Sequence, residues 1–308
     1  MIYVILNGRL GNQLFQYAAA SALAKTYGKD ICLLEVFEKN LIGNFILEKN
    51  TQTGSAEEIR KYKRWVYLYD KLFFVYCKIN RIPSADMAIA RYKFDSKSVK
   101  LLAKLGFVFI QNGYIDIPKI KKENIVLCGF FQCAKFFEKF STEIINEISL
   151  KKKSKKLEKL LIEMDEKNAV CLHIRMGDYV NNPVFGICTM GYYQDAVDKM
   201  KELVSNPKFY VFSDEIQKVK GTIDFHNCEV VYVDNDLSSD ETLVYMSKCN
   251  HFILSNSSFS WWAQYLNGKA NKIVIAPERW NAAEGPFEDI YVADWHLIAV
   301  GGNKKNGQ

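Results

Sequence analysis

The chain has 308 residues, of which 49% are hydrophobic and 25% are charged, and its formal net charge is +6. This is the composition of a globular protein, and the length suffices for one large or two medium domains. The positive charge gathers in short runs, without a nucleic-acid-binding motif or a basic surface interleaved with aromatic residues, so nucleic acid is not an expected partner. No apolar stretch approaches the roughly 18 residues that a membrane span requires.

The start of the chain is predicted to form a strand, a glycine loop and a helix. Residues 2–6 are the strand, 7–11 the loop, and 13–27 a helix that Asn12 caps and Gly28 ends. The helix is apolar nearly all round, which predicts that it is buried. No basic region or cleavage site precedes the strand, so no signal peptide is expected. The eight cysteines form no C-x-x-C pair, which fits reduced thiols in a cytoplasmic protein.

The segment 40–124 is harder to interpret. Within it, the aromatic run 65–76 is flanked by lysine and arginine residues between Lys61 and Arg81. This pattern is typical either of a helix that lies on a membrane surface or of a core helix whose basic side chains reach out to solvent.

The second half of the chain alternates short apolar strands with helices. The charged, helix-prone segment 151–167 is expected to link an N-terminal domain, 1–150, to a C-terminal domain, 168–308. The predicted strands are 169–175, 209–213, 229–234, 251–255 and 272–276, and the predicted helices are 192–204, 215–220, 241–249 and 259–266. This alternation indicates an α/β fold with a doubly wound parallel sheet.

Polar residues collect at the carboxyl ends of these predicted strands, where a parallel α/β sheet binds its ligands. They are His173, Arg175, Asp178, Ser213, Asp214, Asp234, Asp236, Ser255, Asn256, Ser257, Ser258, Pro277 and Glu278. Because side chains alternate along a strand, His173 and Arg175 share one face, and Leu172 and Ile174 share the other. A buried arginine requires an anion, which is either Asp178 or a phosphate of the ligand.

Two predicted helix starts suit a phosphate. Residues 255–258 place small hydroxyl side chains before a helix N-terminus, although such serines can also be simple caps. The loop 8–12 is a second glycine loop before a helix, but it is neither a G-x-G-x-x-G nor a Walker sequence. Together with Arg175 they predict a diphosphate-containing ligand. Asp234 and Asp236 have the spacing of a metal site, yet an arginine that neutralises the leaving phosphate makes a metal unnecessary.

Four segments resemble the α1,2-fucosyltransferases of glycosyltransferase family 11. They are 8–16 (Gly-Arg-Leu-Gly-Asn-Gln-Leu-Phe-Gln), 129–132 (Gly-Phe-Phe-Gln), 173–179 (His-Ile-Arg-Met-Gly-Asp-Tyr) and 251–262 (His-Phe-Ile-Leu-Ser-Asn-Ser-Ser-Phe-Ser-Trp-Trp). They follow the family's order and span nearly the whole chain. The third is similar to the H-x-R-R-x-D motif shared with α1,6- and protein O-fucosyltransferases, but Met176 stands where the family usually has a second arginine.

The resemblance implies two Rossmann-like domains facing a cleft (GT-B type), a GDP-fucose donor, inversion at the anomeric carbon and neither a metal nor another cofactor. The implied acceptor is the 2-hydroxyl of a terminal galactose in an oligosaccharide or a surface-glycan precursor, with the N-terminal domain on the acceptor side. By position, Arg175 would hold the β-phosphate, and Asn12 would approach the phosphate or the fucose. His173 would contact the donor, and the loop 257–259 would cradle the nucleotide.

The expected site combines the strand ends with the family motifs. The residues expected to act in catalysis are Arg175, Asp178 and Asn12. The residues expected to bind the donor are His173, Arg9, Gly11, Ser213, Asp214, Asn256, Ser257, Ser258 and Phe259. Asp178 is either the general base or the residue that orients Arg175.

Two other functions stay open at this point. One is a transferase that uses another nucleotide sugar, and the other is a nucleotide- or glycan-binding module without activity, which Met176 favours. The expected location is the cytoplasm. There the basic aromatic stretch 61–81 would allow peripheral contact with the inner face of a membrane that carries a lipid-linked glycan.

Overall fold

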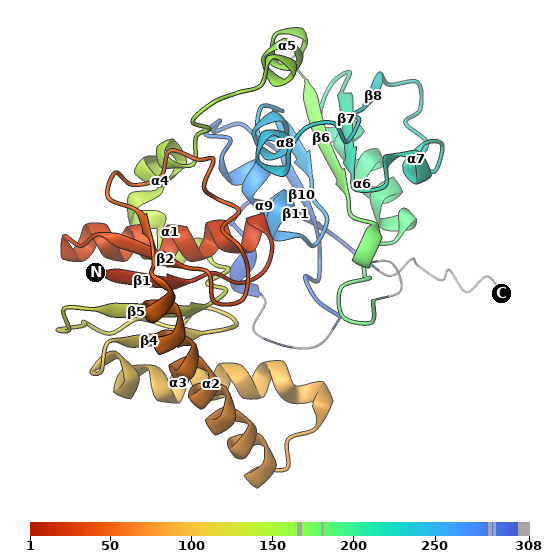
Figure 1. The fold of residues 1–308 in the computed structure, drawn as a ribbon. Helices are drawn as coiled ribbons and strands as arrows, with labels where there is room; N and C mark the ends of the chain where they lie inside the picture. Colours follow the sequence, from red (N-terminus) through yellow and green to blue (C-terminus); the bar gives the residue numbers. More distant parts are fainter. Residues whose placement is uncertain (165–167, 180–181, 283–284, 286–287, 301–308) are drawn as a thin grey trace. The chain divides into compact units, whose positions relative to one another are not determined.

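The computed structural model describes residues 1–164, 168–179, 182–282, 285 and 288–300. They form two α/β units, each built on one sheet whose neighbouring strands are all parallel (Figure 1). The first unit comprises Met1–Lys151 and the described residues of Ala283–Tyr291. The second comprises Lys152–Ala282 and the described residues of Val292–Gln308. The predicted α/β class with a doubly wound parallel sheet is confirmed.

The first unit is a five-stranded sheet with the strand order β3-β2-β1-β5-β4. Its elements are β1 (Ile2–Ile5), α1 (Leu10–Tyr27), β2 (Ile31–Leu34), β3 (Gln52–Thr53), α2 (Ala56–Ile79), α3 (Met87–Ala103), β4 (Phe107–Ile110), β5 (Ile125–Gly129) and α4 (Ser141–Glu147). Helix α1 is buried along most of its length, as predicted, and Gly28 ends it in the left-handed conformation at φ 61°. The strand order reverses at β1, which lies between β2 and β5.

Helices α2 and α3 pack against each other in the segment 40–124 (Figure 1). The Tyr69 hydroxyl of α2 donates to the fully buried carboxylate of Asp95 in α3 at 2.7 Å. Arg91 of α3 pairs with Asp95 at 2.9 Å and with Asp70 of α2 at 2.8 Å. One face of α2 is therefore a core face, as one of the two interpretations predicted, while Phe74 and other side chains of α2 are exposed.

The second unit is a six-stranded sheet with the strand order β11-β10-β9-β6-β7-β8. Its elements are α5 (Lys155–Glu163), β6 (Ala169–Ile174), α6 (Met190–Leu203), β7 (Lys208–Ser213), α7 (Ile216–Val219), β8 (Val230–Tyr232), α8 (Ser239–Met246), β9 (His251–Ile253), α9 (Ser258–Tyr265), β10 (Val274–Pro277) and β11 (His296–Ile298). The chain builds outward from β6 through β7 to β8 and then crosses to β9 on the other side. The boundary of β6 and β9 is therefore the switch point at which such sheets bind ligands.

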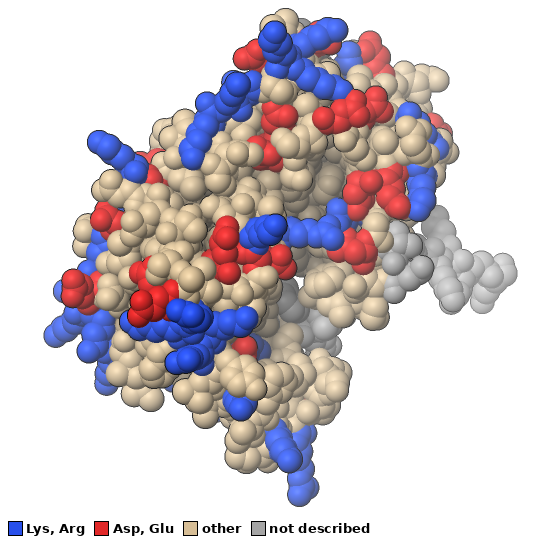
Figure 2. All heavy atoms as spheres, in the orientation of Figure 1, with Lys and Arg blue, Asp and Glu red and all other residues tan. Residues whose placement is uncertain are grey.

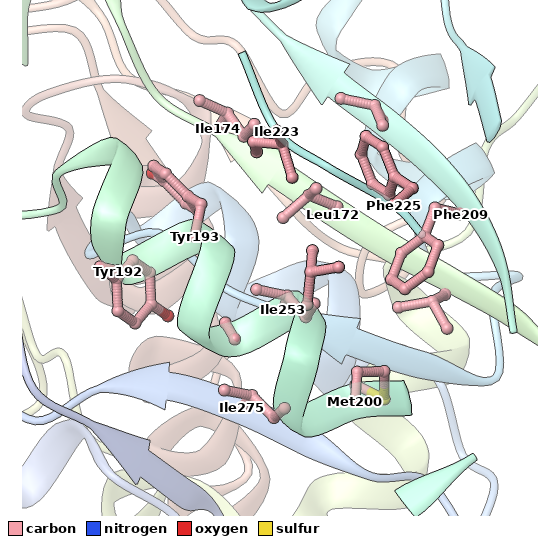
Figure 3. Close-up of a cluster of buried hydrophobic side chains, with 14 of the residues drawn as sticks. Leu172, Ile174, Tyr192, Tyr193, Met200, Phe209, Ile223, Phe225, Ile253 and Ile275 are labelled. Carbon is pink, nitrogen blue, oxygen red and sulfur yellow. The ribbon is translucent and has the colours of Figure 1, made fainter. Parts of the chain in front are cut away.

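Short 3₁₀ turns complete the described chain at Ser84–Asp86, Ala134–Phe136, Glu138–Phe140, Gly177–Tyr179 and Glu288–Ile290. Strand β11 was not among the predicted strands, although Leu297 and Ile298 are apolar; it is a three-residue edge strand whose first two residues are exposed. Leu172 and Ile174 of β6 pack in the core cluster that α6 covers with Tyr193 and Met200 (Figure 3). This confirms the predicted alternation, since His173 points to the opposite face, toward Ser260 of α9.

Candidate functional site

A buried polar cluster joins the ends of β6 and β9 at the switch point of the second unit. His173 is 5% exposed. Its Nδ1 lies 2.5 Å from the Ser260 hydroxyl and 3.1 Å from that of Ser255. Its ring lies 5.7 Å from that of Phe259. Burial, with the nearby charge of Arg175, lowers the pKa of His173 from 6.5 to about 3, so the imidazole is neutral at physiological pH.

Arg175 follows β6 directly, and its guanidinium lies between two carboxylates. Nη1 lies 2.6 Å from Oδ2 of Asp214, and Nη2 donates to Asp178. The guanidinium carbon is also 5.3 Å from the centre of the Tyr179 ring. Asp178 thus pairs with Arg175, and both of its expected roles, as the residue that orients Arg175 and as the general base, stay predictions.

Asp214, at the end of β7, fixes the loop that carries Arg175. Its second oxygen accepts the backbone N–H of Met176 at 2.8 Å. Gly177 has φ +27°, and a Cβ atom there would lie only 2.5 Å from Oδ2 of Asp214. The Met176 side chain packs against the apolar core cluster, so this position adds no cation beside Arg175. The Ser213 hydroxyl accepts the backbone N–H of Glu215 at 3.1 Å and fixes the turn that carries Asp214.

The predicted donor-binding residues after β9 shape the start of α9. Asn256 is 2% exposed, and its Nδ2 donates to the carbonyls of Phe185 at 3.0 Å and Trp280 at 3.2 Å. Ser257 caps α9, because its hydroxyl accepts a first-turn N–H at 3.3 Å, and Ser258 is the first helical residue. Asn256 therefore holds two loops in place, and Ser257 sets the helix N-terminus.

The glycine loop of the first unit differs from its prediction. Helix α1 begins at Leu10 and its N-cap is Arg9, so the prediction that Asn12 caps this helix is wrong. The physical reason is Gly8, whose φ of +74° turns the chain and lets the helix begin earlier. Gly11 is a buried residue within α1.

Asn12 instead links two family motifs that are far apart in the chain. Its Oδ1 accepts a hydrogen bond from Nε2 of Gln132 at 2.8 Å. Asn12 follows β1 and Gln132 follows β5, and these are neighbouring strands at the point where the strand order reverses. A Cβ atom at Gly8 would lie 2.4 Å from Nδ2 of Asn12, so the glycine leaves room for this side chain.

Two further glutamines were given no role from the sequence. Gln13 and Gln16 are both fully buried in α1. Gln13 donates to the carbonyl of Gly8 at 3.1 Å and accepts the N–H of Leu41 at 2.8 Å. Gln16 exchanges two hydrogen bonds with the backbone of Asn7 at 3.0 and 3.1 Å. The sequence did contain a signal for them, two amide side chains in an otherwise apolar helix. Buried amides need hydrogen-bond partners, so this signal predicts that both glutamines bond to nearby polar groups.

In the segment 234–236, whose spacing formally allowed a metal site, two side chains are bonded to other parts of the second unit. Asp236 pairs with Lys156, and Nδ2 of Asn235 donates to the carbonyl of Asp214 at 3.3 Å. Within the described residues, no group of three or more His, Cys, Asp or Glu side chains is arranged to hold a metal ion.

Comparison with known proteins decides the family of this chain. The family model described as "Glycosyl transferase family 11" matches residues 1–299. The chain belongs to glycosyl transferase family 11. The resemblance of the four motifs is thereby confirmed, and the protein is a family 11 glycosyltransferase.

This family 11 enzyme is similar over most of its length to three characterised proteins. The O-antigen biosynthesis glycosyltransferase WbnK of Escherichia coli is 28% identical, over 91% of this chain and 95% of WbnK. An alpha-1,2-colitosyltransferase of Escherichia coli is 30% identical, over 89% of this chain and 90% of that one. Galactoside alpha-(1,2)-fucosyltransferase 2 of Pongo pygmaeus is 27% identical, over 95% of this chain and 78% of that one.

Proposed function

We propose that this enzyme transfers L-fucose from GDP-fucose to the 2-hydroxyl of a terminal galactose in an oligosaccharide or a surface-glycan precursor. The observation that carries the proposal is the switch point of the second unit. There the Arg175 guanidinium follows the same strand as His173, which contacts the N-terminal turn of α9 through Ser260. A cation and a helix N-terminus around one strand end suit a diphosphate. The α1,2 linkage in the names of two relatives supports the linkage.

In the proposed reaction, Arg175 stabilises the charge that grows on the leaving GDP. The bond to the sugar breaks through an oxocarbenium-like state, so a fixed cation interacts more strongly there than in the ground state, which is the condition for catalysis. Asp178 is 51% exposed and Asp214 is 25% exposed. We therefore expect the diphosphate to replace Asp178 on the guanidinium while Asp214 keeps the loop in place. Asp178 is then the candidate general base.

One observation favours a second donor. The colitosyltransferase is 30% identical over nine-tenths of this chain, and a colitosyl group differs from a fucosyl group only in lacking the 3-hydroxyl. A site that hydrogen-bonds this hydroxyl discriminates strongly against the deoxy sugar, whereas an apolar contact does not. The two donors can therefore be separated by their kcat/KM values.

The test is an assay of the purified enzyme with lactose and either GDP-fucose or GDP-colitose, with and without EDTA. We expect GDP-fucose to give GDP and an α1,2-linked trisaccharide, with a kcat/KM at least about tenfold above that of GDP-colitose. EDTA should not change the rate, because we propose that Arg175 supplies the charge that a metal would otherwise supply. A preference for GDP-colitose would overturn the donor, and a loss restored by manganese would overturn the metal-free reaction. GDP binding without turnover on any galactoside would favour a binding module.

Asn12→Ala is expected to lower kcat at least about tenfold with every galactoside acceptor, because the family resemblance assigns this amide to the phosphate or the fucose. Gln132→Ala should act in the same direction, since Gln132 holds Asn12 in position. The matched control is Asn50→Ala, which removes a surface amide that hydrogen-bonds Asp30 at 2.9 Å and should leave kcat unchanged. Normal kcat in both Asn12→Ala and Gln132→Ala would show that the motif is structural only.

A further inference from the structure

An exposed apolar stripe runs along α2 in the first unit. Its members lie alternately three and four positions apart, which places them along one side of a helix. They are Trp65, Leu68, Leu72, Val75 and Ile79, with exposed fractions of 43%, 46%, 53%, 54% and 74%. We call these five residues the α2 stripe. Large contiguous apolar surfaces are uncommon on soluble proteins and mark binding faces.

The α2 stripe is separate from the face by which α2 joins its own core. That core face consists of Tyr62, Val66, Tyr69, Phe73 and Cys77, all of them buried. The core face therefore already supplies the packing that holds α2 on the sheet. Of the stripe, Trp65 also contacts the sheet, with its ring 5.0 Å from that of Phe107 in β4, and folding of this unit does not explain the other exposed apolar side chains.

Basic side chains border the α2 stripe. At 100° of rotation per residue, Arg60, Arg64, Lys71 and Lys78 fall in one arc beside the stripe, and all four are exposed. Asp70 is the single acidic residue between positions 60 and 81, and it pairs with Arg91 of α3. The basic residues of this segment are Arg60, Lys61, Lys63, Arg64, Lys71, Lys78 and Arg81. In Figure 2 the surface around α2 and α3 is mostly tan and blue.

We propose that the α2 stripe and its basic border are a docking face for the surface of an anionic lipid bilayer. A helix that lies in the interface places Trp and Leu side chains among the lipids and Lys and Arg side chains at the headgroups. Among the described residues, no helix combines the length and apolar character needed to cross a bilayer.

The positive charge beside the α2 stripe favours an anionic bilayer over a second copy of the chain as the binding partner. The spacing of the stripe would also suit a pair of helices, in which the residues bordering the seam meet across it. Arg64, Lys71 and Lys78 border the stripe, so two copies of this face would bring cations together without acidic partners. Anionic lipids supply the missing negative charge. The proposal concerns a surface outside the donor site and goes beyond the proposed function.

The test is co-sedimentation of the full chain with vesicles of phosphatidylglycerol and phosphatidylethanolamine, compared with phosphatidylcholine vesicles. The wild-type protein should bind the anionic vesicles, and raised salt should weaken the binding. The double variant Leu72→Glu/Val75→Glu and the double variant Lys71→Ser/Lys78→Ser should each weaken it at least about tenfold. Ile46→Glu is the matched control, because Ile46 is 55% exposed and lies outside α2, and it should bind like the wild type.

Circular dichroism and GDP affinity should be unchanged in all variants, which separates a failure of this proposal from a failure of the donor site. Equal binding to both kinds of vesicle, or equal binding by all variants, would overturn the proposal. A concentration-dependent dimer that the Glu variants abolish, without vesicle binding by the wild type, would show that the occupant is a second copy.

Discussion

Arg175→Ala is expected to lower turnover about 100- to 1000-fold, because it removes the one charge that we propose stabilises the leaving diphosphate. The side chain is 15% exposed, but its partners Asp178 and Asp214 are 51% and 25% exposed and can be solvated once it is removed, so the loss of unfolding free energy should be smaller than for a pair with a fully buried carboxylate. Turnover with GDP-fucose and thermal unfolding of the same preparation measure the two effects. A variant that keeps more than about a tenth of the activity would contradict the assignment.

Arg91 offers a matched control for this substitution. It is 13% exposed, pairs with two carboxylates as Arg175 does, and lies 4.9 Å from the ring centres of Tyr69 and Phe73. Its partner Asp95 is fully buried, so Arg91→Ala should cost about 3–5 kcal/mol of stability. The folded fraction should keep its kcat. Arg175→Ala should thus lower activity more than stability, and Arg91→Ala should lower stability more than activity.

Arg175→Lys tests the shape of the charge. An ammonium keeps the positive charge but cannot make the two-pronged contact of a guanidinium with a phosphate. We therefore expect Arg175→Lys to remain well below wild-type turnover. Recovery to near the wild-type rate would show that charge alone is sufficient at this position.

Gly129→Ala should cost more stability than an alanine at the motif glycines Gly8 or Gly177, where the added Cβ atom would meet side-chain atoms and not backbone. Gly129 has φ +141°, and a Cβ atom there would lie 1.7 Å from the carbonyl oxygen of Ile110. Gly129 pairs with Ile110 in the ladder of β4 and β5, so the clash cannot be relieved without moving strand backbone. We expect a loss of at least about 3 kcal/mol, measured by chemical denaturation.

Alanine substitutions at two other glycines separate the two causes of this loss, backbone strain at a positive φ and the clash of the added Cβ atom. Gly221 has φ +78°, and no described atom lies within 4 Å of the place where a Cβ atom would be, so Gly221→Ala adds only backbone strain, of about 1 kcal/mol. Gly268 has similar open space and no positive φ, so Gly268→Ala should be close to neutral. A Gly129→Ala protein no less stable than Gly221→Ala would mean that the close approach of the two strands is not rigid.

Local patterns in the sequence were enough to predict the strands of the second unit except β11, and to place polar residues at the ends of those strands. Apolar runs of four to six residues marked β6 and β7, and the alternation along β6 correctly separated His173 from Leu172 and Ile174. These features are local because a strand's two faces follow from its own geometry. The motif residues also gave the family, which the match over residues 1–299 confirmed.

Tertiary structure decided which side chains meet. Asn12 and Gln132 are 120 positions apart, and they pair because β1 and β5 are neighbours. Asp214 reaches Arg175 because β7 lies beside β6, and the turn at Gly8 moved the start of α1. The apolar pattern of α2 could not show which of its two faces the sheet would cover. Local sequence sets the shape of each element, but the order of strands and the covering of faces depend on contacts between distant parts of the chain.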